Sequence, residues 1–432
     1  MATDLRDKLR QLGVTKGVTQ VQPPARSRRP RSIQDLVEGQ EIESAQGRTF
    51  VALERYPLNY QHGHAALASL LPQSASIAAQ LGREPRLAEA ELKRAIFLDT
   101  ETTGLSGGTG TLAFLVGIGM FEDEAFHLRQ FFLRDPDEEA AMLAALSDLI
   151  SDYKALVTFN GRGFDLPLLQ TRYTLARMRP KWLGLPHLDL LLPARRVWRD
   201  RLPSCALSSL EAHILGVQRT QDDVPGYLIP QMYLDYLQTG DAHDMLRVMY
   251  HNRQDILSMV TLATQLCQIF GGPFTAASLD PADLVSLGKW YEDLGLTTQA
   301  ERAFRAALDR ELLPAARATA LTRLGLLLKR QERREEAAII WGQLAGCGGV
   351  TGHIELAKHH EWYTRDLEQA LTWTHAALQV VATWPSGYAR DEARAELSHR
   401  LERLERKKHR GATDGQVVRD RCAPLQSDQL TK

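Results

Sequence analysis

Cysteine is scarce in this sequence, which has four in 432 residues: Cys205, Cys267, Cys347 and Cys422. Cysteines so far apart form neither the close pairs of a zinc site nor a disulfide framework. Long apolar runs are also missing, because the longest, 111–121, is far shorter than the roughly 18 to 20 residues of a membrane helix. The first residues include Asp4 and Asp7 and no apolar core, unlike a signal peptide. These absences predict a cytoplasmic protein with no membrane partner.

Net charge is almost absent as well, since 52 basic residues face 53 acidic ones. This balance argues against a protein that coats nucleic acid through bulk charge alone. Basic residues are nevertheless concentrated in 1–32 and again in 400–410. We predict a disordered basic arm over 1–40 and a disordered tail over 406–432, which are more commonly solvated than bound to phosphates. The 44% hydrophobic content is enough for two or three folded domains between them.

One stretch, 95–105, carries a specific chemical signal. Four apolar residues lead into Asp99 and Glu101, and the run breaks at Gly104, which predicts a buried strand that ends in a turn. Because side chains alternate along a strand, the two carboxylates face the same side, about 6.6 Å apart. Their repulsion and desolvation are costly in an apolar strand unless a divalent cation compensates them. The alternative is a strand edge with two solvated acids.

The segment 99–105, Asp-Thr-Glu-Thr-Thr-Gly-Leu, resembles the first motif of the DEDD exonucleases, a branch of the ribonuclease H-like superfamily. Within that superfamily the chain is most similar to the YprB-type proteins, which carry a tetratricopeptide region behind the nuclease-like domain. The resemblance implies a phosphodiesterase that uses two Mg²⁺ or Mn²⁺ ions. It also implies substrate contacts at Thr102, Gly104 and Leu105.

A third acid, Asp165, follows the apolar segment 155–160 in the sequence Phe-Asn-Gly-Arg-Gly-Phe-Asp. This resembles the second exonuclease motif, in which an Asn-Gly turn leads into Phe-Asp at the start of a helix, and it implies a metal ligand at Asp165. The alternative role for Asp165 is a helix cap. Asn160 either holds the turn or touches substrate. Arg162 is a candidate phosphate contact, as is Arg172 further along.

The fourth acid, Asp255, lies in a helix expected over 242–269, four residues after His251. Residues four apart share one helix face, which places a base beside a metal ligand. In the family the third motif puts Tyr or His ahead of the final Asp, but here His251 stands at the spacing usual for Tyr, and Tyr250 at the spacing usual for His. Histidine is the better base near neutral pH, which favours His251 over Tyr250. The alternative is a surface His-Asp contact.

The remaining pattern predicts three antiparallel strands followed by alternating helices and strands, which is the order that the resemblance implies. The expected strands lie within 95–101, 111–120, 125–133, 155–160 and 187–191. We therefore predict an α/β fold for 95–272, a ribonuclease H-like mixed five-stranded sheet flanked by helices. A basic segment around Trp198 suits either single-strand contacts or a covered core edge. The loop 222–226 is expected to border the cleft.

Two further regions flank this domain. Residues 41–94 are expected to form an extension packed on it, with a short strand near 49–53, a short helix over 85–93, and a His-Gly-His at 62–64 that is more often structural than metal-binding. After 280 the sequence becomes rich in short Ala- and Leu-containing helices whose spacing predicts all-α tetratricopeptide-like repeats over 280–405. Stacked helix pairs commonly bind protein segments, so a protein partner is expected there.

Two functions remain open from the sequence. The first is a metal-dependent 3′ to 5′ exonuclease, or a related phosphodiesterase, on single-stranded DNA or RNA. In it Asp99, Glu101, Asp165 and Asp255 hold two Mg²⁺ or Mn²⁺ ions and His251 acts as the base. The second is a nucleic-acid-binding scaffold with weak or no catalysis that recruits a protein through its repeats.

Overall fold

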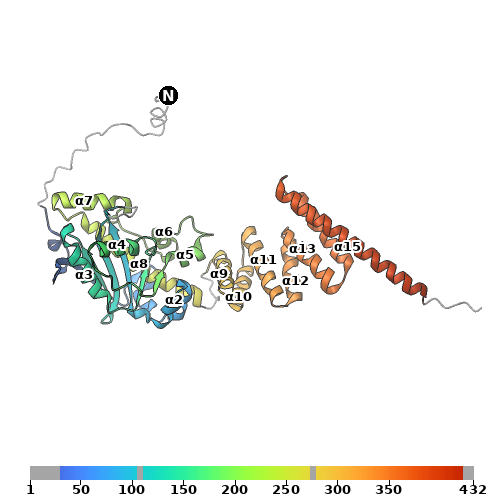
Figure 1. Ribbon diagram of the computed structural model, residues 1–432, viewed down its shortest axis with the longest axis horizontal. Helices are drawn as coiled ribbons and strands as arrows, with labels where there is room; N and C mark the ends of the chain where they lie inside the picture. Colours follow the sequence, from blue (N-terminus) through green and yellow to red (C-terminus); the bar gives the residue numbers. More distant parts are fainter. Residues whose placement is uncertain (1–29, 105–109, 273–278, 422–432) are drawn as a thin grey trace, which may run out of the picture.

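The computed structural model describes residues 30–104, 110–272 and 279–421. Leu105, most of the basic arm and the last residues of the tail lie outside these ranges. Figure 1 shows an elongated molecule with a sheet and its helices at one end and a row of helices extending from it. None of the helices in the described ranges combines the length and the apolar character needed to cross a bilayer.

The main sheet has the strand order β1-β2-β7-β6-β5-β8-β9. Its strands are β1 (Gly39–Ser44), β2 (Gly47–Pro57), β5 (Ala95–Thr102), β6 (Ala113–Glu122), β7 (Ala125–Phe132), β8 (Ala155–Thr158) and β9 (His187–Asp189). Pairing is antiparallel from β1 through β5 and parallel between β5, β8 and β9. A mixed α/β sheet is thus confirmed, but it has seven strands and not five.

The two extra strands, β1 and β2, come from the N-terminal extension. β2 pairs along the whole of β7, so it covers an edge that would otherwise expose unpaired backbone groups. The predicted short strand at 49–53 is the buried centre of this longer one. The predicted helix over 85–93 appears instead as two 3-10 turns, η3 (Pro85–Glu89) and η4 (Leu92–Arg94).

Helices cover both faces of the sheet. One face packs on α3 (Glu139–Ile150), α4 (Asp165–Leu175) and α7 (Ile229–Thr239). The other packs on α2 (Ala75–Gly82), α5 (Leu191–Trp198) and the long α8 (Met245–Gly271). Along β5, Phe97 belongs to the α8 side and Leu98 to the other side. By strand alternation Asp99 and Glu101 therefore face α8, whereas Thr100 faces α4.

Short elements complete this part of the chain. They are the hairpin of β3 (Gln61–His62) and β4 (Ala65–Ala66), α6 (Leu207–Leu210), the π-helix η6 (Glu211–Leu215), and the 3-10 helices η1 (Ile33–Asp35), η2 (Leu67–Leu70), η5 (Pro136–Glu138) and η7 (Gly226–Leu228).

The C-terminal region is a helical array. It comprises α9 (Pro281–Asp293), α10 (Thr297–Leu308), α11 (Pro314–Arg330), α12 (Arg334–Gly346), α13 (Val350–His359), the π-helix η8 (His360–Thr364), α14 (Leu367–Ala382) and α15 (Tyr388–Arg421). α15 runs through the first part of the segment predicted as a tail. The first two helix pairs share one packing device, in which a Cβ at Gly288 would lie 2.5 Å from Phe304 and one at Gly325 would lie 2.6 Å from Trp341.

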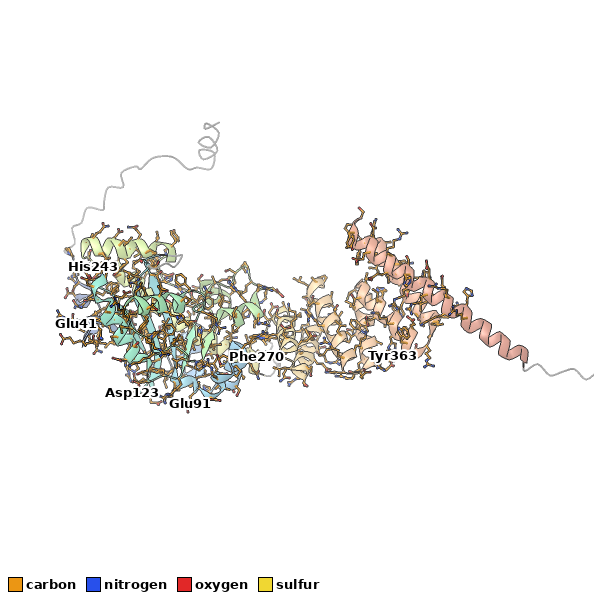
Figure 2. All side chains as sticks on the ribbon, in the orientation of Figure 1. Glu41, Glu91, Asp123, His243, Phe270 and Tyr363 are labelled. Atoms are coloured by element: carbon orange, nitrogen blue, oxygen red, sulfur yellow. The ribbon has the colours of Figure 1, made fainter. Side chains whose placement is uncertain are left out.

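The array joins the sheet domain through a continuous apolar core at the end of α8. The ring of Phe270 lies 4.9 Å from that of Trp290, and the hydroxyl of Tyr291 donates to the Phe270 carbonyl at 2.5 Å. Figure 2 labels Phe270 at this junction. At the same junction, Arg201 binds the buried Asp283 at 2.8 Å. The two parts are therefore packed together and not merely tethered.

Candidate active site

The site begins where β5 meets α8. The side-chain amide of Asn252, which is fully buried, donates to Asp99 Oδ2 at 2.8 Å. The oxygen of the same amide accepts from Gln130 on β7 at 2.8 Å, which fixes its orientation. Gly117 on β6 makes room for it, because a Cβ there would lie 2.1 Å from the Asn252 oxygen. Asn252 was not predicted, although it stands inside the third motif.

Asp165 reaches the same strand from its other face. It is the first residue of α4, is 4% exposed, and accepts a hydrogen bond of 2.5 Å from the Thr100 hydroxyl. Burial raises the pKa of Asp165 to about 6, although the Thr100 hydroxyl and backbone N–H groups oppose that change. Asp165 therefore lies beside the β5 acids, but is bonded to the residue between them.

The α8 residues His251 and Asp255 face each other as predicted, with Nε2 of His251 3.8 Å from Asp255 Oδ2. Nδ1 of His251 lies 2.7 Å from Asp223 in the 222–226 loop. A carboxylate at that distance requires a proton on Nδ1, so in the neutral ring Nε2 carries the lone pair. Arg219, whose Nη1 is 3.1 Å from Nδ1, is then a close neighbour and not a donor to it.

Tyr250 points away from this pair. Its hydroxyl accepts from the Thr220 backbone N–H at 3.1 Å, and its ring lies 4.9 Å from the Arg253 guanidinium. Of the two candidates that the spacing left open, His251 is the one that contacts Asp255.

Arg219 is the main residue that sequence reasoning missed. Its guanidinium binds Asp255 directly, forms a bidentate pair with Glu211 at 2.7 Å for each bond, and lies 3.4 Å from Asp223. Burial works to lower the pKa of Arg219, but its bonds to Glu211 and the charge of Asp255 outweigh burial and raise it. The residue lies in an irregular segment after η6, where no motif marks it.

A buried chain of hydrogen bonds supports Arg219 from behind. Glu211 is 1% exposed and accepts from the Ser258 hydroxyl at 2.6 Å. Because Ser258 donates to a carboxylate, it accepts from Nε2 of His62, which lies 2.8 Å away. Burial lowers the pKa of His62 to about 4, so this ring is neutral. The first histidine of the His-Gly-His thus has a structural contact.

The acids influence one another strongly. Burial raises the pKa of Asp99 well above its ordinary value, and the charges of Asp255 and Asp165 raise it further. The pKa of Glu101 is raised in the same way by burial, then by Asp99, Asp255 and Asp165. The four acids predicted from the three motifs are therefore near enough to interact at the end of one strand.

The turn before α4 carries two candidate substrate residues. Asn160, with φ of 65°, and Arg162 are exposed, and their backbone N–H groups donate to Asp189 at 2.8 and 3.0 Å. Asp189, at the end of β9, was not predicted and holds this turn in place. Arg172 is buried against Glu139 at 2.6 Å.

The other candidates lie at the end of β5. The Thr102 hydroxyl donates to the Gly104 carbonyl at 2.8 Å, so this pair shapes the turn that leaves the strand. Trp198 is 1% exposed and covers the core, so its ring is not available for stacking on a base.

The acids supply donors of the kind that a hard divalent cation binds, although their spacing is not that of a formed site. Within 30–104, 110–272 and 279–421 no three His, Cys, Asp or Glu side chains are arranged closely enough to hold a metal ion. The guanidinium of Arg219 compensates the charge of Asp255. Among these same residues Glu101 has no hydrogen bond or ion pair, and Asp99 has only the amide of Asn252. Crowded carboxylates without cationic partners are oxygen donors that fit Mg²⁺ or Mn²⁺.

Comparison with known proteins agrees with this fold. The family model of the RNase H superfamily matches residues 96–267, which hold every candidate acid. The uncharacterized protein YprB of Bacillus subtilis (strain 168) is 30% identical over 360 residues, covering 82% of this chain and 84% of that protein. The predicted ribonuclease H-like fold is confirmed. The chain belongs to the RNase H superfamily, in the family of YprB-like proteins.

Proposed function

We propose that this protein is a metal-dependent nuclease that removes nucleotides from the 3′ end of single-stranded DNA or RNA. The observation that carries the proposal is the set of carboxylates around β5: Asp99, Glu101 and Asp255 influence one another electrostatically, and Asp165 approaches from the other face of the strand. Structural acids are normally paired with cations, whereas Asp99 and Glu101 are buried with other carboxylates as their neighbours.

Each residue has a definite part in this reaction. Asp99, Glu101, Asp165 and Asp255 would hold two Mg²⁺ or Mn²⁺ ions, which activate a water and stabilise the leaving oxygen when bound. His251 accepts the proton of the attacking water at Nε2, because Asp223 keeps Nδ1 protonated. Asn252 holds Asp99 in place, and Arg162 contacts a phosphate of the substrate.

The decisive experiment compares wild type with Asp99→Asn on a single-stranded oligonucleotide labelled at its 5′ end, in Mn²⁺. We expect a ladder of products shortened from the 3′ end, and a loss of rate of about 10³-fold or more in the variant. Mg²⁺ in place of Mn²⁺, duplex and hybrid substrates, and EDTA complete the panel.

The matched control is Asp123→Asn. Asp123 is an exposed acid in the β6–β7 turn, with φ of 46°, a conformation that Asn adopts readily, and it lies at the opposite end of the sheet from Asp99. Figure 2 labels it at the edge of the molecule. Its variant should cleave at the wild-type rate. Equal cleavage by Asp99→Asn would remove this site from the reaction.

A second candidate function is a nucleic-acid-binding scaffold with weak or no catalysis. The ion pair between Arg219 and Asp255 favours it, because a fixed guanidinium there replaces a cation. Calorimetric titration with Mn²⁺ separates the two candidates. Binding that disappears in Asp165→Asn supports the nuclease, whereas heat that is the same in wild type and variant supports the scaffold.

A further inference from the structure

The junction between the sheet domain and the helical array encloses a basic cavity of about 600 Å³. Seven of its lining residues are Arg or Lys and three are Asp, which leaves an excess of four positive charges. The walls come from α5, α9 and α11, with the end of α2 and the turn before α4. Figure 1 shows α5 beside α9 at this junction. Neither part of the chain forms the cavity alone.

Several of these cations are already paired. Arg196 binds Asp293 at 3.0 Å, Lys289 binds Asp200 at 2.6 Å, and Arg323 binds Glu292 at 3.2 Å. The first two pairs connect the sheet domain with the array.

Three other lining cations have no such partner. Arg83, Arg162 and Arg195 are exposed and form no ion pair with any residue in the described ranges. Arg83 follows α2 with φ of 50°, Arg162 lies on the turn before α4, and Arg195 lies on α5. Cations from three separate elements thus converge on one solvent-filled space, where an anion would find them unpaired.

The cavity borders the turn that leads to Asp165, one of the candidate acids. Arg162 lines it and stands three residues before Asp165, while Asp189 lines it and holds the same turn. A chain of phosphates that leaves the acid cluster past Arg162 would therefore enter the cavity.

The walls favour a sugar-phosphate backbone over stacked bases. Trp290 is 1% exposed and is covered by Arg196, whose guanidinium lies 5.7 Å from its ring, so it offers no open face. The volume is that of a pocket for a small molecule or a short stretch of one strand. Backbone contacts of this kind are independent of sequence.

We propose that the cavity between α5 and α9 binds the phosphates of a single-stranded nucleic acid that extends from the acid cluster, so that the helical array forms one wall of the substrate track. The inference deepens the proposed nuclease function and rests on it for the class of ligand. It gives the array a direct contact with substrate.

The test is binding of a fluorescent single-stranded oligonucleotide to the full-length protein in EDTA, measured by anisotropy at several salt concentrations. The double variant Arg83→Glu/Arg195→Glu removes two unpaired cations outside the proposed catalytic residues. We expect its Kd to rise at least about tenfold, and the slope of log K against log salt to fall by about 1.4. Asp200→Asn frees Lys289 and removes an acid, so it should bind two- to threefold more tightly.

The matched control is Arg48→Glu at the β1 edge of the sheet, opposite to the β9 edge that borders the cavity. It changes the net charge of the chain by the same amount per substitution and should leave the Kd within about twofold. Thermal unfolding checks that each variant folds. Equal losses in Arg48→Glu and the double variant would overturn the proposal.

A second readout separates this proposal from the proposed nuclease. Hydrolysis of a nucleoside 5′-phosphate p-nitrophenyl ester in Mn²⁺ needs the acid cluster and no strand in the cavity. The double variant should hydrolyse the ester at the wild-type rate and show a higher KM for the oligonucleotide.

Absence of ester hydrolysis by wild type would refute the proposed nuclease function but not the binding site in the cavity. An unchanged Kd in the double variant would refute the binding site alone. Displacement of the oligonucleotide by polyglutamate at equal charge concentration would assign the cavity to an acidic protein and overturn the proposal.

Discussion

Acids are buried in both halves of this molecule, but they are compensated in opposite ways. In the array, the Glu361 side chain is fully buried and is bound by Arg400, Arg403 and Lys407. Burial works to raise its pKa, but these cations outweigh burial and hold the pKa of Glu361 below its ordinary value. Glu355 is bound by two lysines and behaves in the same way.

At the end of β5 the balance is reversed. Asp99 and Glu101 have other carboxylates as neighbours, so burial and like charge raise the pKa of each of them. The comparison shows which acids maintain the fold and which weaken it. An acid whose charge is costly in the metal-free protein is one that a cation can stabilise.

The largest expected effect tests the crowded side of this comparison. Glu101→Gln should lower the rate of nuclease cleavage by about 10³-fold, because a metal ligand is lost. The same change should raise the free energy of unfolding in EDTA by about 1 kcal/mol, because one of the repelling charges is gone. Activity assays and urea denaturation measure both. A variant less stable than wild type would contradict the account of crowding.

The next effect tests the compensated side. Glu361→Gln leaves three cations around a neutral side chain and should lower the free energy of unfolding by about 3 kcal/mol, with cleavage unchanged. Glu368→Gln is the control, since Glu368 is 71% exposed and pairs with Lys408 on the surface. Its expected cost is under about 0.5 kcal/mol. Equal costs for the two variants would mean that the Glu361 cluster adds nothing.

Arg219 combines the two patterns, compensated acids and crowded acids, because this cation pairs with one of the candidate site acids. Arg219→Gln leaves Glu211 buried without its cation and should cost about 2 kcal/mol of stability. It should also lower kcat by about 10- to 100-fold with little change in KM, since Asp255 and His251 lose their support. Arg247→Gln is the control, because Arg247 lies on the same face of α8 as His251 and Asp255 but donates to backbone carbonyls. A rise in cleavage would instead show that the guanidinium blocks metal binding.

The smallest effect separates burial from like-charge crowding. Burial lowers the pKa of His187 to about 4; the charge of Arg162 lowers it further, whereas the charges of Asp189 and Glu84 oppose the change. The His187 ring forms a hydrogen bond of 2.8 Å with the Thr158 hydroxyl. A folded-state pKa below the unfolded value means that the unfolded state binds more protons, so stability falls as the pH is lowered. Between pH 7 and 5.5 wild type should lose about 1 kcal/mol at this residue. The stability gap between wild type and His187→Gln should shrink by that amount, as urea denaturation at both pH values will show.

Much of the fold follows from local patterns in the sequence. The apolar run before Asp99, the Asn-Gly turn before Asp165 and the i,i+4 pair on α8 each predicted an element and an acid. The elements are present, and Asp165 lies against β5, the strand that carries Asp99. Glycine and aromatic spacing at Gly288 and Phe304 also marked the first helix pair.

What the sequence did not predict depends on contacts between distant residues. Arg219 and His62 belong to one buried chain of bonds, but they lie 157 residues apart and neither stands in a repeating pattern. Strand β1 was missed, and β2 was predicted only at its buried centre, for a related reason. β2 pairs with β7, which is far along the chain, and the alternation of exposed and buried residues is weak at the ends of both strands.

The continuous helix α8 has a mechanical consequence. Its 27 residues span about 40 Å, with Asp255 in the half nearer its start and Phe270 packed against the array at its end. A continuous helix of this length does not bend enough to accommodate a tilt of α9. A partner that binds the far helices would therefore act on the same helix that carries Asp255. A movement of the C-terminal half would shift Asp255 relative to the position of the scissile phosphate.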